Sequence, residues 1–198
     1  MHSEREGDVM TALRIMVVAA FTLLSAGMLA GTAAAQTIKD FQGHFVGIGV
    51  TRVKQVEGSV AARDRDLDVV IIAGSDGGFS LSWKTVYLYR WTKSEKSKKR
   101  FSSLTFTPTD KKNVWRAARS GDPLAGRAMI WARLAGKVLT VYVVAADPKG
   151  GLATAIYERT LTKNGMLLRF ASRHNGKVVR TVNAELKRAK PEKKMKKK

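Results

Sequence analysis

Two Asn-Gly turns near the end of the chain constrain the fold more than any other feature. They separate three runs in which apolar and polar residues alternate: Leu152–Thr162, Met166–Arg173 and Val178–Leu186. Asn-Gly favours a type I′ turn, which needs a positive φ at both central residues and joins two antiparallel strands. Gly151–Leu186 is therefore predicted to be an antiparallel meander.

The chain before this meander continues the same pattern. Further strands are predicted at Phe41–Val53, Leu67–Ala73, Phe79–Trp91, Phe101–Thr107, Ala128–Leu134 and Val138–Ala145, and Val114–Ala118 fits either a strand or a helical turn. The connections are short and leave no room for β-α-β crossovers, which is typical of barrels and sandwiches. A meander in chain order closes most simply when its last strand pairs with its first. The predicted fold class is all-β, a single antiparallel meander that closes into a barrel of about 8–10 strands.

Two predicted strands have distinctive faces. Alternate residues of Phe79–Trp91 form one long apolar and aromatic face, as expected for a strand that buries one side. In Phe41–Val53, Gly47 and Gly49 share a face. Two glycines on one face indicate a close backbone approach or a bend, and barrels require both.

The start of the first predicted strand carries a family resemblance. Gly43-His44-Phe45 resembles the G-x-W signature that begins the first barrel strand of lipocalins. In that family a basic residue on the last strand packs over the tryptophan, and the resemblance implies this role for Arg180. The chain differs in having Phe45 in place of Trp, no disulfide and no evident helix after the barrel. The resemblance implies a lipocalin-like (calycin-type) barrel, also seen in uncharacterised exported bacterial proteins, and it transfers no chemistry.

The first 35 residues resemble an export signal. Ile15–Ala35 is uncharged and mostly apolar, follows Arg14 and ends in three alanines. These features predict a secretory signal peptide over residues 1–35 that is cleaved after Ala35, and hence a periplasmic or secreted protein. Acidic residues before Met10 fit a signal poorly, so translation from Met1 or from Met10 stays open. A retained membrane anchor is the alternative, since about 20 uncharged residues can span a bilayer.

Charge and cysteine content bear on the mature chain. The 198 residues include 36 Lys and Arg, 16 Asp and Glu and no Cys, which gives a net charge of +20. A secreted domain without disulfides must rely on its core for stability. Like charges repel along residues 187–198, so this segment is predicted to be a disordered Lys-rich tail. One barrel domain is then expected over residues 36–186.

Catalytic and metal sites find little support among these residues. His44 and His174 are the only histidines after the predicted leader, and the chain has no HExxH, P-loop or G-x-S-x-G motif. The Asp64-x-Asp66-x-Asp68 stretch lacks the Gly and Glu that an EF-hand loop needs at its sixth and twelfth positions. We therefore predict no enzyme, no cofactor and no metal.

Aromatic residues at alternating positions suggest a ligand cavity. A barrel of about eight strands can hold one small ligand, and Trp and Tyr suit a wall with few polar anchors. Arg159 is predicted to point inward and to anchor an anionic head group. The residues predicted to line the site are Trp83, Tyr87, Trp131, Tyr142, Tyr157 and Arg159. The alternative is that these residues fill the core or lie outside it.

Basic residues form a second candidate site in a predicted loop. The predicted polyanion-binding residues are Lys93, Lys96, Lys98, Lys99 and Arg100. Export disfavours nucleic acid as a partner, whereas anionic lipid, lipopolysaccharide or another envelope polymer fits the compartment. The first hypothesis is an exported, non-enzymatic binding protein that holds a small apolar or amphipathic ligand in the barrel. The second is a basic envelope-associated protein that binds polyanions; the sequence leaves the oligomeric state open.

Overall fold

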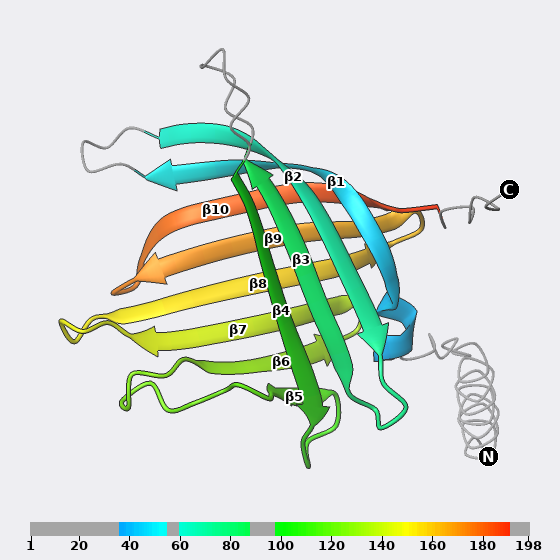
Figure 1. Cartoon of the computed structure of the whole chain (residues 1–198), viewed down its shortest axis with the longest axis horizontal. Coiled ribbons are helices and arrows are strands. Elements are labelled where there is room, and N and C mark those ends of the chain that lie inside the picture. Colours follow the sequence, from blue (N-terminus) through cyan, green and yellow to red (C-terminus); the bar gives the residue numbers. More distant parts are fainter. Residues whose placement is uncertain (1–35, 55–59, 88–97, 191–198) are drawn as a thin grey trace, which may run out of the picture. The chain divides into compact units, whose positions relative to one another are not determined.

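The computed structural model describes residues 36–54, 60–87 and 98–190, and for residues 60–66, 86, 87, 98 and 99 it describes the backbone alone. These residues form an all-β fold in which ten strands follow one another as an antiparallel meander and close into a barrel (Figure 1). The predicted fold class is thereby confirmed. Within the described ranges, no helix is long and apolar enough to cross a membrane.

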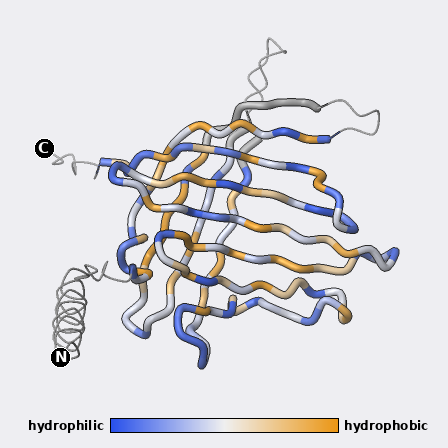
Figure 2. Tube along the Cα trace, turned by 180° about the vertical axis from the view of Figure 1, so that it is seen from behind, coloured by the Kyte–Doolittle hydropathy of each residue, from blue (hydrophilic) through white to orange (hydrophobic). Residues whose placement is uncertain are grey.

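The elements follow the chain without a crossover. They are η1 (Ile38–Phe41), β1 (Gly43–Lys54), β2 (Val60–Ala73), β3 (Phe79–Tyr87), β4 (Lys98–Pro108), β5 (Val114–Ala117), β6 (Met129–Ala135), β7 (Val138–Ala146), β8 (Leu152–Thr162), β9 (Gly165–His174) and β10 (Lys177–Arg188). β1 pairs with β2 on one side and with β10 on the other, which closes the barrel. Hydropathy alternates along the strands because one face of each points inward (Figure 2).

The two Asn-Gly segments make different turns. At the β9–β10 hairpin, Asn175 and Gly176 have φ values of 48° and 77°, as the predicted type I′ turn requires. At the β8–β9 hairpin, neither Asn164 nor Gly165 has a positive φ, so the predicted type I′ turn is wrong there although the hairpin forms. Gly165 is instead required by packing, because a Cβ atom at this position would collide with the backbone oxygen of Leu186.

Several strands are longer than the sequence predicts. β2 begins at Val60, before the predicted start at Leu67, because it pairs with β1 along the whole of Gly43–Lys54. β4 begins at Lys98, so Arg100 lies in a strand and outside the predicted basic loop. β10 runs to Arg188, two residues past the predicted end of the barrel at Leu186. In each case, pairing with a neighbouring strand of the barrel extends a segment that has weak strand character of its own.

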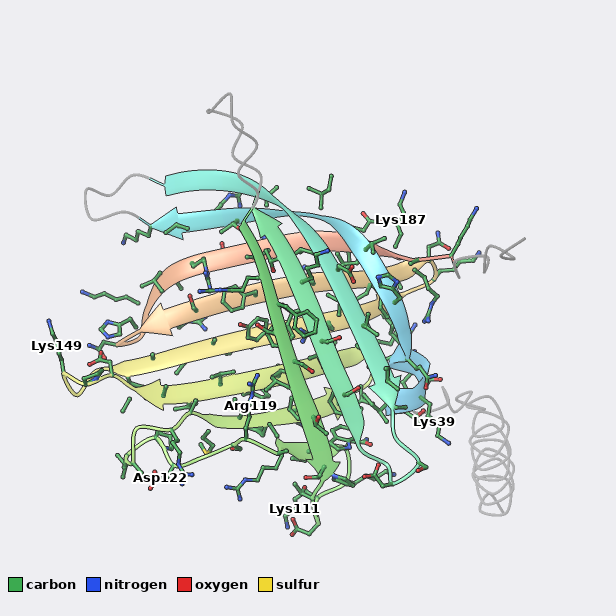
Figure 3. All side chains as sticks on the ribbon, in the orientation of Figure 1. Lys39, Lys111, Arg119, Asp122, Lys149 and Lys187 are labelled. Atoms are coloured by element: carbon green, nitrogen blue, oxygen red, sulfur yellow. The ribbon has the colours of Figure 1, made fainter. Side chains whose placement is uncertain are left out.

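A plug of apolar side chains fills one end of the barrel. At the start of η1, Thr37 N and Oγ1 donate hydrogen bonds to Asp40 Oδ2, and Asp40 N donates to the Thr37 backbone oxygen. η1 buries Ile38 and Phe41. Fully buried, inward-facing residues of the neighbouring strands complete this core: Phe45, Ile71, Leu81, Phe106, Leu139, Met166 and Leu186. Charged residues such as Lys39, Lys111 and Lys149 point away from the barrel (Figure 3). The space left for a ligand is therefore limited to the remaining part of the interior.

The predicted close approach at Gly47 and Gly49 lies on the inward face of β1. A Cβ atom at Gly47 would collide with the backbone oxygen of Glu185 on β10. A Cβ atom at Gly49 would lie 2.8 Å from Leu67 Cδ1 and 2.9 Å from the Cβ atom of Ala184. These glycines allow β1 to approach its neighbours closely where the barrel closes.

The basic residue over the first-strand aromatic ring is Arg188, and Arg180 does not have this role. The Arg188 guanidinium lies 4.7 Å from the centre of the Phe45 ring, and its Nη1 donates a hydrogen bond of 2.6 Å to the Gln42 backbone oxygen. The register of β1 and β10 explains the difference, since Phe45 pairs with Arg188 whereas Arg180 pairs with Val53 at the far end of β1.

β5 forms a weak seam in the barrel wall. This strand has four residues, and it pairs with β4 only along Phe106–Pro108 and with β6 only along Trp131–Arg133. The segment after β5 bridges part of the remaining gap, because Ala118 N donates to Thr105 O and Arg119 Nη2 donates to Ser103 O (Figure 3). Within the described residues, no strand pairs with β4 on this side between Lys98 and Thr105.

Candidate functional site

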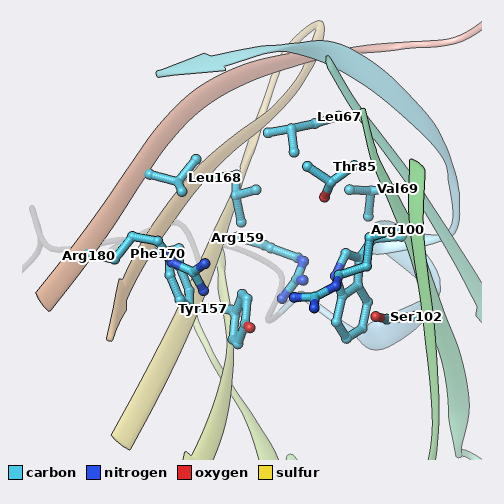
Figure 4. Close-up of a pocket in the computed structure, with 12 residues that line it drawn as sticks. Leu67, Val69, Thr85, Arg100, Ser102, Tyr157, Arg159, Leu168, Phe170 and Arg180 are labelled. Carbon is cyan, nitrogen blue, oxygen red and sulfur yellow. The ribbon is translucent and has the colours of Figure 1, made fainter. Parts of the chain in front are cut away.

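A cavity of about 140 Å³ lies inside the barrel, next to the apolar plug. It is lined by side chains from β2, β3, β4, β8, β9 and β10: Leu67, Val69, Trp83, Thr85, Arg100, Ser102, Tyr157, Arg159, Leu168, Phe170, Arg180 and Val182 (Figure 4). Pockets for drug-sized ligands measure about 300–1,000 Å³, whereas an engineered apolar cavity of about 150 Å³ holds benzene. The interior is therefore hollow enough for one small ligand.

Three of the six predicted wall residues meet at this cavity. Trp83, Tyr157 and Arg159 line it together. The structure describes only the backbone of Tyr87, so its predicted role lies outside the described side chains.

Trp131 and Tyr142 lie on the outer face of the barrel and do not line the cavity. Their rings stack on each other, with centroids 5.0 Å apart and planes 12° from parallel. Ile130 and Ala132 are the buried residues beside Trp131. Because successive side chains of a strand point to opposite faces, Trp131 points outward, and Tyr142 is its partner in register on the same face.

Arg159 is the most unusual side chain of the site. It is only 2% exposed, and its Nε and Nη1 atoms have no hydrogen-bond partner among the described residues. β8 places it there by alternation, since Tyr157 also faces inward while Glu158 between them is exposed. A buried polar group without a partner is costly, and a buried charge is more so.

Two more arginines face the same space. Arg180 from β10 is half-buried with its Nε unpaired, and Arg100 from β4 is exposed on the cavity wall. Figure 4 shows the guanidinium groups of Arg100, Arg159 and Arg180 pointing toward the middle of the cavity from three strands. No Asp or Glu is among the described residues that line it.

Aromatic rings form the wall around these cations. The Tyr157 ring lies 4.5 Å from Phe170 and 6.0 Å from Trp83, measured between ring centres. Arg180 lies 4.9 Å from the centre of the Phe170 ring, and Arg159 lies 5.6 Å from that of Tyr157. Cations over ring faces are partly stabilised by the ring quadrupole, so the site holds its positive charges without a carboxylate.

Burial alters the acid–base behaviour of the site. Desolvation lowers the pKa of Arg159 to about 10, partly opposed by Tyr157. Desolvation raises the pKa of Tyr157, partly opposed by the positive charges of Arg159 and Arg180. At neutral pH the arginine is therefore charged and the tyrosine keeps its hydroxyl proton.

Arg100, Phe170 and Arg180 were missed as wall residues. A sequence signal exists for each, because each is an even number of residues from buried, inward-facing residues of the same strand. These reference residues are Leu104 and Phe106 for Arg100, Leu168 for Phe170, and Val182 and Leu186 for Arg180.

The predicted polyanion site is described only in part. Lys93 and Lys96 lie outside the described residues, and Lys98 and Lys99 are described by backbone alone. Only Arg100 can be placed, and it lines the cavity. Binding to anionic lipid or envelope polymers stays a prediction without support from the described residues.

The two predicted histidines form exposed pairs with aspartates. His44 Nε2 lies 2.8 Å from Asp68 Oδ1, and His174 Nε2 contacts Asp147 Oδ2. Neither histidine lines the cavity. Among the described residues, no group of three or more His, Cys, Asp or Glu is placed to hold a metal ion.

Comparison with known proteins supports the fold class. No protein-family model matches the chain, and no curated protein matches its sequence. A solved protein of unknown function from the DUF3598 family of Nostoc punctiforme is similar in structure, with a TM-score of 0.53 at 14% identity. That match covers 83% of this chain and 53% of the other, so the chain spans about half the length of this neighbour. At this identity the likeness shows the fold alone, and the predicted lipocalin-like barrel is confirmed.

A second solved structure, an S-type phycobiliprotein lyase from Guillardia theta, matches with a TM-score of 0.35 and 9% identity, over 79% of this chain and 95% of the other. That protein is named as a lyase. The prediction that this chain is not an enzyme is withdrawn, because neither a fold nor a cavity that can hold a ligand excludes acting on that ligand.

Proposed function

We propose that the barrel binds a small ligand with an apolar or aromatic body and an anionic group. The observation that carries this proposal is Arg159, a buried guanidinium that faces the cavity with two nitrogen atoms unpaired. Charges inside proteins are normally paired with an opposite charge or with hydrogen-bond acceptors. An anionic ligand group supplies both.

The remaining wall defines the other part of the ligand. Leu67, Leu168 and Val182 provide apolar surface, and Trp83, Tyr157 and Phe170 add rings. Ligand sites commonly combine such walls with a few convergent polar groups. The cavity of about 140 Å³ favours a body near the size of one aromatic ring.

Calorimetric titration with benzoate and with benzyl alcohol tests the proposal, because both carry one ring and only benzoate carries a charge. We expect benzoate to bind more tightly than benzyl alcohol to the wild-type chain. The Arg159→Met variant should lose this preference while the unchanged ring wall still accepts the alcohol. Since Arg159 is shielded from solvent, added salt should weaken benzoate binding less than it weakens binding to exposed cations.

Arg133→Met is the matched control. Arg133 is an exposed arginine on β6, outside the cavity lining, so its loss should leave the preference for benzoate unchanged. The proposal is overturned if the folded wild-type protein binds neither compound saturably, or if Arg159→Met and Arg133→Met behave alike.

A further inference from the structure

The positive charge around the cavity exceeds what one carboxylate can neutralise. Arg159 is buried, Arg180 is half-buried and Arg100 is exposed, and all three line the same space. The described lining residues include no acidic side chain. A ligand with a single negative charge would leave at least two of these cations without a counter-charge.

The cavity also offers many hydrogen-bond donors. The unpaired nitrogen atoms, Nε and Nη1 of Arg159 and Nε of Arg180, are donors without any acceptor function. Tyr157 adds a hydroxyl whose proton is retained because desolvation raises its pKa. Thr85 and Ser102 add two more hydroxyl groups. Such a set suits a group with several acceptor oxygens and high negative charge.

Phosphate monoesters match these requirements better than carboxylates do. A phosphate monoester carries about −1.5 to −2 charges at pH 7 and presents three strong acceptor oxygens. A carboxylate offers one charge and two oxygens. Arginine binds phosphate through planar, charge-assisted hydrogen bonds, and clusters of arginine are a common means of phosphate recognition.

We infer that the anionic group bound beside Arg159 and Arg180 is a phosphate monoester on a small apolar or aromatic body. This inference rests on the function proposed above and specifies its ligand class. Arg180 lies over the Phe170 ring and Arg159 lies near the Tyr157 ring, and these two rings are 4.5 Å apart, so both guanidiniums face the same cavity.

The pH dependence of binding separates a phosphate from a carboxylate. The charged and titratable groups facing the cavity are Arg100 from β4, Tyr157 and Arg159 from β8, and Arg180 from β10; the described linings from β2, β3 and β9 are uncharged. Arginine side chains in proteins stay protonated, and tyrosine titrates well above this range, so neither residue type changes charge between about pH 5 and 7.5. The two paired histidines lie outside the cavity. A pH effect in this range therefore reports the second ionisation of the phosphate, near pH 6.

The experiment is calorimetric titration of the full chain with phenyl phosphate, benzoate and inorganic phosphate at about pH 7.5 and about pH 5. We expect phenyl phosphate to bind roughly tenfold more tightly than benzoate at the higher pH, as one additional charge-assisted hydrogen bond would provide. This advantage should shrink at the lower pH, where phenyl phosphate is a monoanion. Inorganic phosphate should bind more weakly than phenyl phosphate because it lacks the ring.

Two variants and one further probe complete the test. Arg180→Met should remove the preference for phenyl phosphate over benzoate, whereas Arg133→Met should retain it. Hexyl phosphate distinguishes a lipid-like phosphate from an aromatic one, since the ring wall should favour phenyl phosphate. Binding of benzoate without a preference for phenyl phosphate, or a preference that is independent of pH, overturns this inference and leaves the proposed function standing. Failure of all of these compounds to bind overturns both.

Discussion

At the scale of single residues, the barrel is distinguished by an arginine placed where hydrophobic residues are expected. On β8, Arg159 is an inward-facing residue between Tyr157 and Leu161, which face inward too. A hydrophobic side chain would satisfy that position without exposing unpaired donors to a low-dielectric interior. The residue is therefore better explained by a ligand than by the stability of the unliganded fold.

Replacing Arg159 with Met should keep or increase the stability of the unliganded protein. Methionine has a similar length and carries no charge, so the variant avoids the cost of buried, unpaired donors, about 1–3 kcal/mol. Urea unfolding near pH 7 without ligand measures the difference from the wild type. Because the pKa of Arg159 falls to about 10, the folded state loses this proton before the unfolded chain does, and the difference should shrink as the pH rises above 10.

The control for this measurement is again the exposed Arg133→Met substitution, which should change stability by less than about 0.5 kcal/mol. A clear loss of stability in Arg159→Met would show that Arg159 supports the fold itself.

At the scale of elements, the barrel depends on how closely β1 approaches its two neighbours. β1 is the strand that joins the first and last parts of the meander, and it pairs with β2 and β10 along most of its length. Gly47 lies close to the β10 backbone, and any side chain there would meet the Glu185 backbone oxygen. β1 and β10 can therefore pair this closely, and so close the barrel, because Gly47 has no Cβ atom.

Gly47→Ala should destabilise the protein by about 1–3 kcal/mol, because the added methyl group forces the β1 and β10 backbones apart. The midpoint of urea denaturation measures this effect. Ile48→Ala on the same strand is the control, since Ile48 is 62% exposed and its loss should cost much less. Equal losses in the two variants would contradict a close approach at Gly47.

At the scale of the whole molecule, the barrel is unevenly held together. β8, β9 and β10 pair along nearly their full lengths, whereas β5 contributes only a short bridge between β4 and β6. Arg100 and Ser102 lie on the part of β4 that no described strand covers on this side. The cavity is thus bounded by the least supported section of the wall.

Hydrogen exchange should be faster in β4 and β5 than in β9, because local opening starts where few backbone hydrogen bonds hold a strand. Mass spectrometry of deuterium uptake, resolved by peptide, measures this order. Arg119→Ala removes the hydrogen bond to Ser103 and should speed exchange in β4 further. Arg116→Ala is an exposed control on β5 itself. Slower exchange in β4 than in β9 would contradict this assignment of the seam.

Much of the fold could be predicted because its signals are local. The β9–β10 turn is encoded by Asn175 and Gly176, and the inward phase of β3 is evident from Phe79, Leu81 and Trp83. The first part of β2 could not be predicted, because its stretch of arginines and aspartates forms a strand only through pairing with β1. The predicted leader, residues 1–35, and most of the predicted tail, residues 191–198, lie outside the described ranges and stay predictions.

The site could be predicted only where the sequence pattern shows which residues of a strand point inward. Arg159 is two residues from Tyr157 and therefore points to the same side, and both line the cavity. On β6, both faces carry apolar residues, with Ile130 on one and Trp131 on the other, so periodicity could not decide which of them points inward.

The sequence by itself determined the order of the strands, their antiparallel sense and the inward position of Arg159, because turns and alternation act between neighbours in the chain. Only the tertiary structure decided that Arg188, and not Arg180, covers Phe45, and that Arg100 and Arg180 meet Arg159 at one cavity. The reason is register: the row in which residues of distant strands meet depends on how the whole ring closes, and no local pattern encodes it.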